Sequence, residues 1–207
     1  MTQETLSEQE TKRLLARQKE LQSEAREVLE KLDLYPPLQK IGKTRQQGSS
    51  ALGLMVWRDI DLGVSCPQGV ELQQILQKSM FPLYNHPSVQ QIRFINDSGQ
   101  FRLAGNDERY YFAVHYRAPQ KEEWKIDISF WTNTDEHPEP LHDAVALGLT
   151  EEYRLTILWI KDIWHQLPDY RTKVYSIDIY DAVLNQGVRT PREFDEYLRA
   201  RGKPTRG

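Results

Sequence analysis

The chain has 207 residues, which is long enough for one domain or two small ones with a buried core. Charged residues make up 28% of it and the mean hydropathy is -0.68, which excludes a largely apolar membrane protein and indicates a soluble one. The formal net charge of -3 and the pI near 6.0 argue against a broad nucleic-acid surface, because such surfaces carry an excess of basic residues.

The sequence also favours a particular compartment. No run of apolar residues approaches the roughly 18 that a membrane span requires, and the N-terminus lacks the apolar segment of a secretory signal. Cys66 is the single cysteine, so an internal disulfide is impossible, which fits a reducing environment. We therefore expect a cytoplasmic protein that makes no membrane contacts.

Residues 7–32 are predicted to form a long helix. Ser7 and Glu10 have the spacing of a capping box, in which each side chain satisfies a free backbone donor. Apolar residues recur at helical spacing along it, at Leu14, Leu21, Ala25, Val28, Leu29 and Leu32. This stripe is too short and uneven for a sustained coiled coil, so we expect the helix to pack on its own domain; a partner helix is the alternative.

The next segment contains a turn followed by two acidic residues. A strand over residues 38–47 is expected to lead into a tight turn at Gly48-Ser49, where small residues let the backbone approach a phosphate. From residue 56 to 64 the pattern alternates, so Asp59 and Asp61 project from the face opposite Ile60. Two adjacent carboxylates repel unless a cation lies between them, and oxygen ligands suggest Mg²⁺ or Mn²⁺.

This combination resembles the signature of a known superfamily. Gly48-Ser49, nine further residues and then Asp59-Ile60-Asp61-Leu62 resemble the motif of the nucleotidyltransferases with a DNA polymerase β-like fold, of the small antibiotic or minimal type. The resemblance covers roughly residues 40–131. Two positions depart from it: Gln47 replaces a hydrophobic residue, and Leu52 stands where many small members carry an arginine.

The remaining core elements predict an α+β fold with a mixed sheet. Pro67 opens a helix that reaches about Met80, and two hairpins follow. The first is expected to pair residues 92–95 with 100–103, and the second 110–116 with 124–131. We expect three segments: an N-terminal helix over residues 1–35, a nucleotidyltransferase-like core over 36–147 and a C-terminal helical segment over 148–207.

Asp127 is the candidate for the third acid of the motif. It alternates with the apolar Ile126 and Ile128, so its side chain points to the opposite face of its strand. A second Asp with isoleucine neighbours, Asp178, lies in a helical pattern and is expected on a solvated helix face. We therefore assign Asp127 to the site.

The C-terminal segment is predicted to be helical. Thr150 is placed to cap a helix that ends at Pro168, and a second helix is expected over residues 173–185. Thr190 and Glu193 have the spacing of a further capping box, with Pro191 at the first helical position. This box predicts a last helix that extends to about residue 201.

The resemblance implies metal-dependent transfer of a nucleoside monophosphate from a nucleoside triphosphate to an acceptor hydroxyl. It assigns Asp59, Asp61 and Asp127 as catalytic residues and as ligands of Mg²⁺ or Mn²⁺, with Asp127 also placed to take the hydroxyl proton. It assigns Gly48 and Ser49 to the triphosphate. In place of the missing arginine, the positive charge would come from the nearby basic residues Lys43, Arg45 or Arg58.

The acceptor is less defined by the sequence. No lysine or arginine occurs between Lys125 and Arg154, a stretch rich in acidic residues that would suit a cationic small molecule. A solvated acidic surface is the alternative. A protein acceptor, as in toxin–antitoxin pairs, or a non-catalytic nucleotide-binding module would also fit, and the oligomeric state is left open. His137 and His142 are expected to be surface residues rather than zinc ligands, because Pro138 and Pro140 would prevent a regular helix there.

Overall fold

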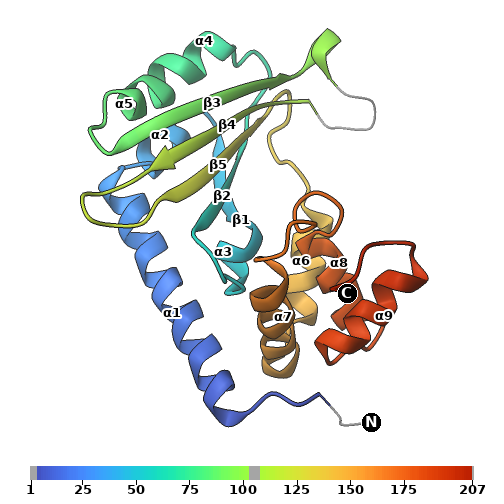
Figure 1. Cartoon of the computed structure of the whole chain (residues 1–207). Coiled ribbons are helices and arrows are strands. Elements are labelled where there is room, and N and C mark those ends of the chain that lie inside the picture. The colour runs from blue at the N-terminus through green and yellow to red at the C-terminus, as the bar shows by residue number, and fades with distance from the viewer. Residues whose placement is uncertain (1–3, 103–107, 207) are drawn as a thin grey trace. The chain divides into compact units, whose positions relative to one another are not determined.

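The computed structural model describes residues 4–102 and 108–206, and it shows the expected α+β fold class (Figure 1). The chain divides into two compact units. The sheet unit comprises Ser23–Ala51 and Arg58–Glu139, and the helical unit comprises Met1–Gln22, Leu52–Trp57 and Pro140–Gly207. The short segment from Leu52 to Trp57 thus belongs to the helical unit, although both of its neighbours in the chain belong to the sheet unit.

The sheet unit is built on a five-stranded mixed sheet in the order β1-β2-β5-β4-β3. Its strands are β1 (Lys43–Gln47), β2 (Asp59–Ser65), β3 (Val89–Asp97), β4 (Arg109–Tyr116) and β5 (Trp124–Trp131). The central pair β2 and β5 is parallel, and every other neighbouring pair is antiparallel. The predicted hairpin of β4 with β5 is confirmed.

The first hairpin differs from its prediction. Strands β3 and β4 do pair, but residues 99–101 form a short 3-10 helix, so the predicted second strand over 100–103 is wrong. Residue 103, the end of that predicted strand, lies outside the described residues. The cause is local, because Gly99 has a φ of +54°, a left-handed conformation that does not continue a strand.

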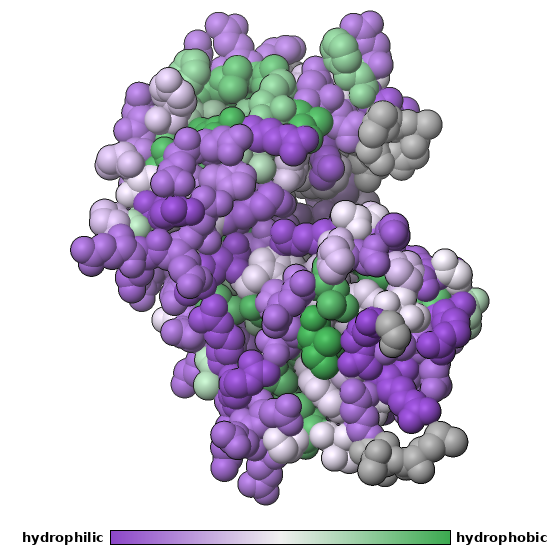
Figure 2. Space-filling view, viewed as in Figure 1, coloured by the Kyte–Doolittle hydropathy of each residue, from purple (hydrophilic) through white to green (hydrophobic). Residues whose placement is uncertain are grey.

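Helices of the sheet unit lie beside its strands. They are α2 (Tyr35–Gln39), α3 (Gly48–Leu52, which ends in the helical unit), α4 (Leu72–Ile75), a π-helical turn (Leu76–Met80) and α5 (Phe81–Tyr84). The helix expected from Pro67 therefore begins five residues later, because Gly69 adopts a φ of +88°. In Figure 2 hydrophobic side chains gather over the part of this unit that Figure 1 labels α4 and β3.

The predicted N-terminal helix is confirmed as α1 (Glu8–Lys31). The Ser7 hydroxyl accepts a hydrogen bond from the backbone N–H of Glu10, and the Glu10 carboxylate accepts one from the Ser7 backbone. All residues of the predicted stripe are buried. The strand expected over residues 38–47 is present as β1 (Lys43–Gln47), but its first two positions, 38 and 39, belong to α2, because Pro36 and Pro37 favour a helix start just before them.

The helical unit contains four further helices. They are α6 (Pro140–Gly148), α7 (Glu151–Trp164), α8 (Ser176–Asn185) and α9 (Pro191–Ala200). The predicted caps of α7 and α9 are confirmed: the Thr150 hydroxyl accepts from the backbone of Tyr153, and Thr190 from that of Glu193. Helix α6 was not expected, but Pro140 occupies its first position, where its missing N–H is harmless.

Among the described residues, none of the helices combines the length and the apolar character that a bilayer crossing requires.

Candidate active site

The two acids of the motif project from the polar face of β2. Their neighbours Ile60 and Leu62 are 0% and 1% exposed and belong to the opposite, apolar face. Asp59 is largely buried as well, at 8% exposed, whereas Asp61 is more accessible. The period-2 alternation of a strand therefore presents both carboxylates on one side, as the sequence predicts.

Asp127 lies next to these acids across the sheet. In the parallel pairing of β2 with β5, Asp61 is the register partner of Asp127, and Asp59 is the partner of Lys125. Because register partners on neighbouring strands share a face, the three aspartates stand on the same side of adjacent strands. The Oδ1 atom of Asp127 is buried and has no hydrogen-bond partner among the described residues.

Lys125 is a site residue that the sequence analysis did not identify. Its Nζ atom donates a hydrogen bond of 2.5 Å to Asp127 Oδ2 and lies 4.0 Å from Asp59 Oδ1. Burial lowers the pKa of Lys125, but the hydrogen bond to Asp127 and the negative charges of both aspartates outweigh burial and raise the pKa. The available signal was its position two residues before Asp127, which places both side chains on one face.

Tyr111, on strand β4, is a further residue that interacts with Asp127. Burial and the interaction of its hydroxyl with Asp127 raise the pKa of Tyr111 to about 12. The residue is thus a neutral hydrogen-bonding group at physiological pH. It lies on the same face as Asp127 because its neighbour two residues along, Ala113, is the register partner of Asp127.

The Gly48 turn lies directly against Asp61. Gly48 has a φ of +61°, and a β-carbon built there would stand 2.2 Å from Asp61 Oδ2. The Ser50 hydroxyl closes the turn by donating a 3.1 Å hydrogen bond to the carbonyl of Gln47, and Ser49 is 8% exposed. Glycine is therefore required at position 48 both for the backbone conformation and for this close approach.

Two of the three basic residues that were candidates to bind phosphate, Arg58 and Lys43, have acidic partners in the structure. Arg58 donates hydrogen bonds to Glu24, at 2.9 Å and 3.3 Å, and also binds Glu122. Lys43 pairs with Glu136 at the far end of β1, about 13 Å from Gln47, the residue before Gly48, at the usual rise per strand residue. Neither side chain is placed at the Gly48 turn.

The three expected metal ligands, Asp59, Asp61 and Asp127, are not arranged as a metal-binding group in the structure. Within residues 4–102 and 108–206, no three His, Cys, Asp or Glu side chains form a group that could hold a metal ion. The ammonium group of Lys125 lies among these acids, where it binds the carboxylate of Asp127 and approaches Asp59. The donor chemistry still fits a hard divalent ion: Asp59 and Asp61 supply oxygens from one face, and Asp127 Oδ1 is an available buried acceptor.

The segment after β5 folds back onto the same polar face. Trp131 is stacked on His137 with ring centroids 3.9 Å apart and an interplanar angle of 10°. The backbone N–H of His137 donates to Ser65 Oγ, and Glu139 accepts a 2.7 Å hydrogen bond from Gln47. His137 is thus built into the sheet unit, and no zinc site is formed around it by the described residues.

Three acids of the stretch between Lys125 and Arg154 have basic partners. Glu136 pairs with Lys43, Glu151 with Arg154 and Glu152 with Arg189, each within 4 Å. This arrangement favours the solvated-surface alternative over a preformed site for a cationic acceptor.

The segment around Leu52 is held by the helical unit. Leu52 is 8% exposed and packs in the core of that unit. Arg154 of α7 donates hydrogen bonds to the carbonyls of Leu52, at 2.7 Å, and Gly53, at 2.9 Å. Lys161, which is fully buried, donates to the carbonyl of Leu54 at 2.8 Å. The residue at the position of the missing arginine therefore has a packing role.

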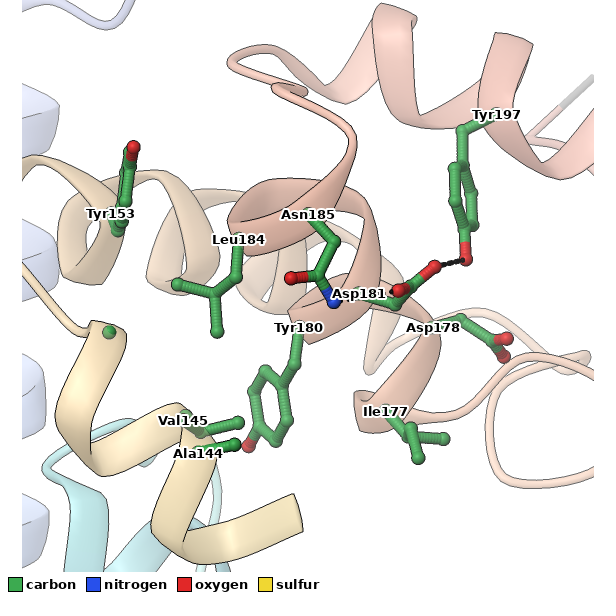
Figure 3. Close-up of a pocket in the computed structure, with 11 residues that line it drawn as sticks. Ala144, Val145, Tyr153, Ile177, Asp178, Tyr180, Asp181, Leu184, Asn185 and Tyr197 are labelled. Atoms are coloured by element: carbon green, nitrogen blue, oxygen red, sulfur yellow. Dashed lines mark hydrogen bonds between the residues drawn. The ribbon is translucent and has the colours of Figure 1, made fainter.

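A separate cavity of about 550 Å³ lies within the helical unit (Figure 3). It is lined by residues of α6, α7, α8 and α9, among them Val145, Tyr180 and Leu184. Its carboxylates are already engaged: Asp181 accepts from Tyr197 at 2.7 Å, and Asp178 pairs with Lys203. Asp178 also accepts from the backbone N–H of Tyr175, so it caps α8 instead of lying on an open helix face.

Comparisons with known proteins identify the fold. No family model matches the sequence, and no curated protein matches it. Among solved structures, the STING-associated CdnE c-di-GMP synthase from Capnocytophaga granulosa matches with a TM-score of 0.50 and 14% identity, over 87% of this chain and 67% of the synthase.

Two further solved structures are similar to this chain. CdnC from E. coli MS115-1, solved with ATP, has a TM-score of 0.49 and 15% identity over 91% of this chain and 71% of its own. The Cid1 poly(U) polymerase has a TM-score of 0.48 and 17% identity over 74% of this chain. This chain spans about half the length of that polymerase, 47%.

Proposed function

We propose that this chain, which has the nucleotidyltransferase fold, is an enzyme that transfers a nucleoside monophosphate from a nucleoside triphosphate to the hydroxyl of a small-molecule acceptor. One observation carries the proposal: Asp59, Asp61 and Asp127 share one face of adjacent strands, and the Gly48 turn lies against Asp61. A glycine turn beside paired acids brings phosphate-binding backbone and carboxylates together in one place.

The proposed roles follow from this placement. Asp59 and Asp61 would hold a Mg²⁺ or Mn²⁺ ion, which supplies positive charge for the phosphate oxygens when it is bound. Gly48 and Ser49 would bind the β- and γ-phosphates. Asp127, oriented by Lys125, would accept the proton of the acceptor hydroxyl.

The reaction balances with these groups alone. The acceptor oxygen forms a bond to the α-phosphorus, the bond from that phosphorus to the bridging oxygen breaks, and pyrophosphate leaves with its electron pair. The hydroxyl proton passes to the Asp127 carboxylate. Holding the reactants in line accounts for much of the rate increase that such a site would provide.

A transfer assay tests the proposal. The chain is incubated with Mg²⁺ and each of ATP, GTP, CTP and UTP labelled at the α-phosphate, together with a panel of amine-bearing and neutral polyhydroxyl acceptors. Label on an acceptor, lost in the Asp61→Asn variant, supports a small-molecule transferase. Label on a protein band instead supports a protein acceptor, whereas triphosphate binding without any labelled product identifies a non-catalytic nucleotide-binding module.

A further inference from the structure

The positive charge of Lys125 lies inside the group of acidic side chains. Its Nζ atom is 2.5 Å from Asp127 Oδ2 and 4.0 Å from Asp59 Oδ1. The side chains involved are sheltered, with 31% of Lys125, 18% of Asp127 and 12% of Asp59 exposed. A cation in a sheltered position between two carboxylates offsets their mutual repulsion, as a bound metal ion would do.

The strands hold this ammonium group in place. Lys125 and Asp127 are two residues apart on β5 and therefore share a face, and Lys125 is the register partner of Asp59 on β2. Both strands lie in the middle of the sheet, where neighbours on each side fix their positions. The contact thus follows from backbone pairing and does not depend on a loop.

We propose that the Lys125 ammonium group, and not a divalent ion, neutralises the carboxylate of Asp127. This polar face would then bind a single divalent ion, at Asp59 and Asp61. The inference rests on the proposed function, because it concerns the ions of the same site. A second divalent ion could reach only the remaining oxygen, Oδ1, of a carboxylate whose Oδ2 already holds an ammonium group at 2.5 Å, and two cations on one carboxylate repel each other.

The alternative is that Lys125 swings away when metal enters. Asp127 would then become a metal ligand, and the ion pair of Lys125 with Asp127 would exist only in the metal-free protein. The two cases differ in the number of ions bound and in the effect of removing the Asp127 carboxylate. Neither difference requires the nucleotide or the acceptor to be known.

Direct measurement of Mn²⁺ binding to the full chain separates these cases. Free Mn²⁺ is followed by electron paramagnetic resonance during titration, at low salt and without nucleotide. We expect one ion on the unmodified chain, two on Lys125→Met, one on Asp127→Asn and none on Asp61→Asn. The control Lys121→Met, which removes an exposed lysine from the loop before β5, should bind one ion like the unmodified chain.

Two ions on the unmodified chain, or loss of the ion in Asp127→Asn, would overturn the inference and leave the proposed function standing. No ion on the unmodified chain would overturn both. If Lys125→Met does not fold, as judged by circular dichroism, the Asp127→Asn result still decides, because asparagine keeps a carbonyl oxygen for Lys125 and removes only the charge.

Discussion

Gly48 lies so close to Asp61 that a β-carbon at residue 48 would stand 2.2 Å from the Asp61 carboxylate oxygen Oδ2. The contact joins the Gly48 turn to the acid that follows thirteen positions later in the chain. Such a distance is far inside van der Waals contact, so any side chain at residue 48 must displace the carboxylate. Position 48 thereby couples the phosphate-binding turn to the acidic face.

The first prediction is that Gly48→Ala impairs transfer far more than it impairs folding. The left-handed φ of +61° costs an alanine about 1 kcal/mol, which a folded chain tolerates. The displaced Asp61 carboxylate should reduce kcat by about 100-fold, the usual scale for misplacing a reacting group by roughly 1 Å. Thermal unfolding and the labelled-triphosphate assay measure the two effects.

Gly99→Ala is the matched control for this substitution. Gly99 also has a left-handed φ, +54°, but a β-carbon there would meet nothing within 4 Å. It should show the same small loss of stability and full activity. Equal activity of the two alanine variants would refute the link between Gly48 and Asp61.

The second prediction is that Asp61→Asn abolishes transfer and leaves the fold intact. Asparagine has nearly the same shape, so the contact with Gly48 is kept, but the charge that would hold a divalent ion is lost. The melting temperature should stay within a few degrees while labelled product disappears. Asp135→Asn, which changes an exposed aspartate after β5, should remain active. Turnover of a well-folded Asp61→Asn protein at the level of the unmodified chain would remove Asp61 from the catalytic residues.

The third prediction concerns Arg58, which the sequence suggested as a triphosphate ligand. Only 15% of its side chain is exposed, and it binds Glu24 and Glu122. Arg58→Met should therefore lower the free energy of unfolding by about 1–3 kcal/mol, because two carboxylates lose a partner. The KM for the triphosphate should not change, and denaturant unfolding together with steady-state kinetics checks both parts.

Lys43→Met provides the comparison for Arg58. Lys43 and Glu136 are 58% and 68% exposed, and exposed pairs contribute little to stability. This variant should match the unmodified chain in both measurements. A tenfold rise of KM in either variant would restore a phosphate-binding role to that residue.

The fourth prediction is that Cys66 is chemically inert in the folded chain. Its side chain is 0% exposed, and burial raises the pKa of its thiol to about 12. The thiolate that reacts with iodoacetamide is therefore scarce and shielded at pH 8. Mass spectrometry should detect no carbamidomethyl adduct on native protein and complete labelling in guanidinium chloride. Rapid labelling of native protein would contradict this burial.

Cys66 also determines a pH dependence of stability. Because its pKa is higher in the folded chain than the ordinary value of 9.0, its contribution is fully present below pH 9. That contribution is lost as the pH rises from about 9 towards about 12. A Cys66→Ser variant, which does not titrate in this range, should lack that part of the decline in melting temperature.

The sequence by itself determined the features that depend on near neighbours. The capping boxes at Ser7 and Thr190 join residues three apart, so their hydrogen bonds form within a single helical turn. The common face of Asp59 and Asp61 follows from the alternation of one strand, whatever lies beside it. The α+β class could likewise be predicted, because alternating and helical patterns are local.

Only the tertiary structure decided the contacts that cross between strands. Lys125 lies between Asp127 and Asp59 because β2 and β5 pair in parallel with one particular register, and a shift of one residue would have sent these side chains to opposite faces. The approach of Gly48 to Asp61 likewise requires β2 to turn back and pair with β1. Register and strand order depend on how the whole core packs, and no short stretch of sequence contains that information.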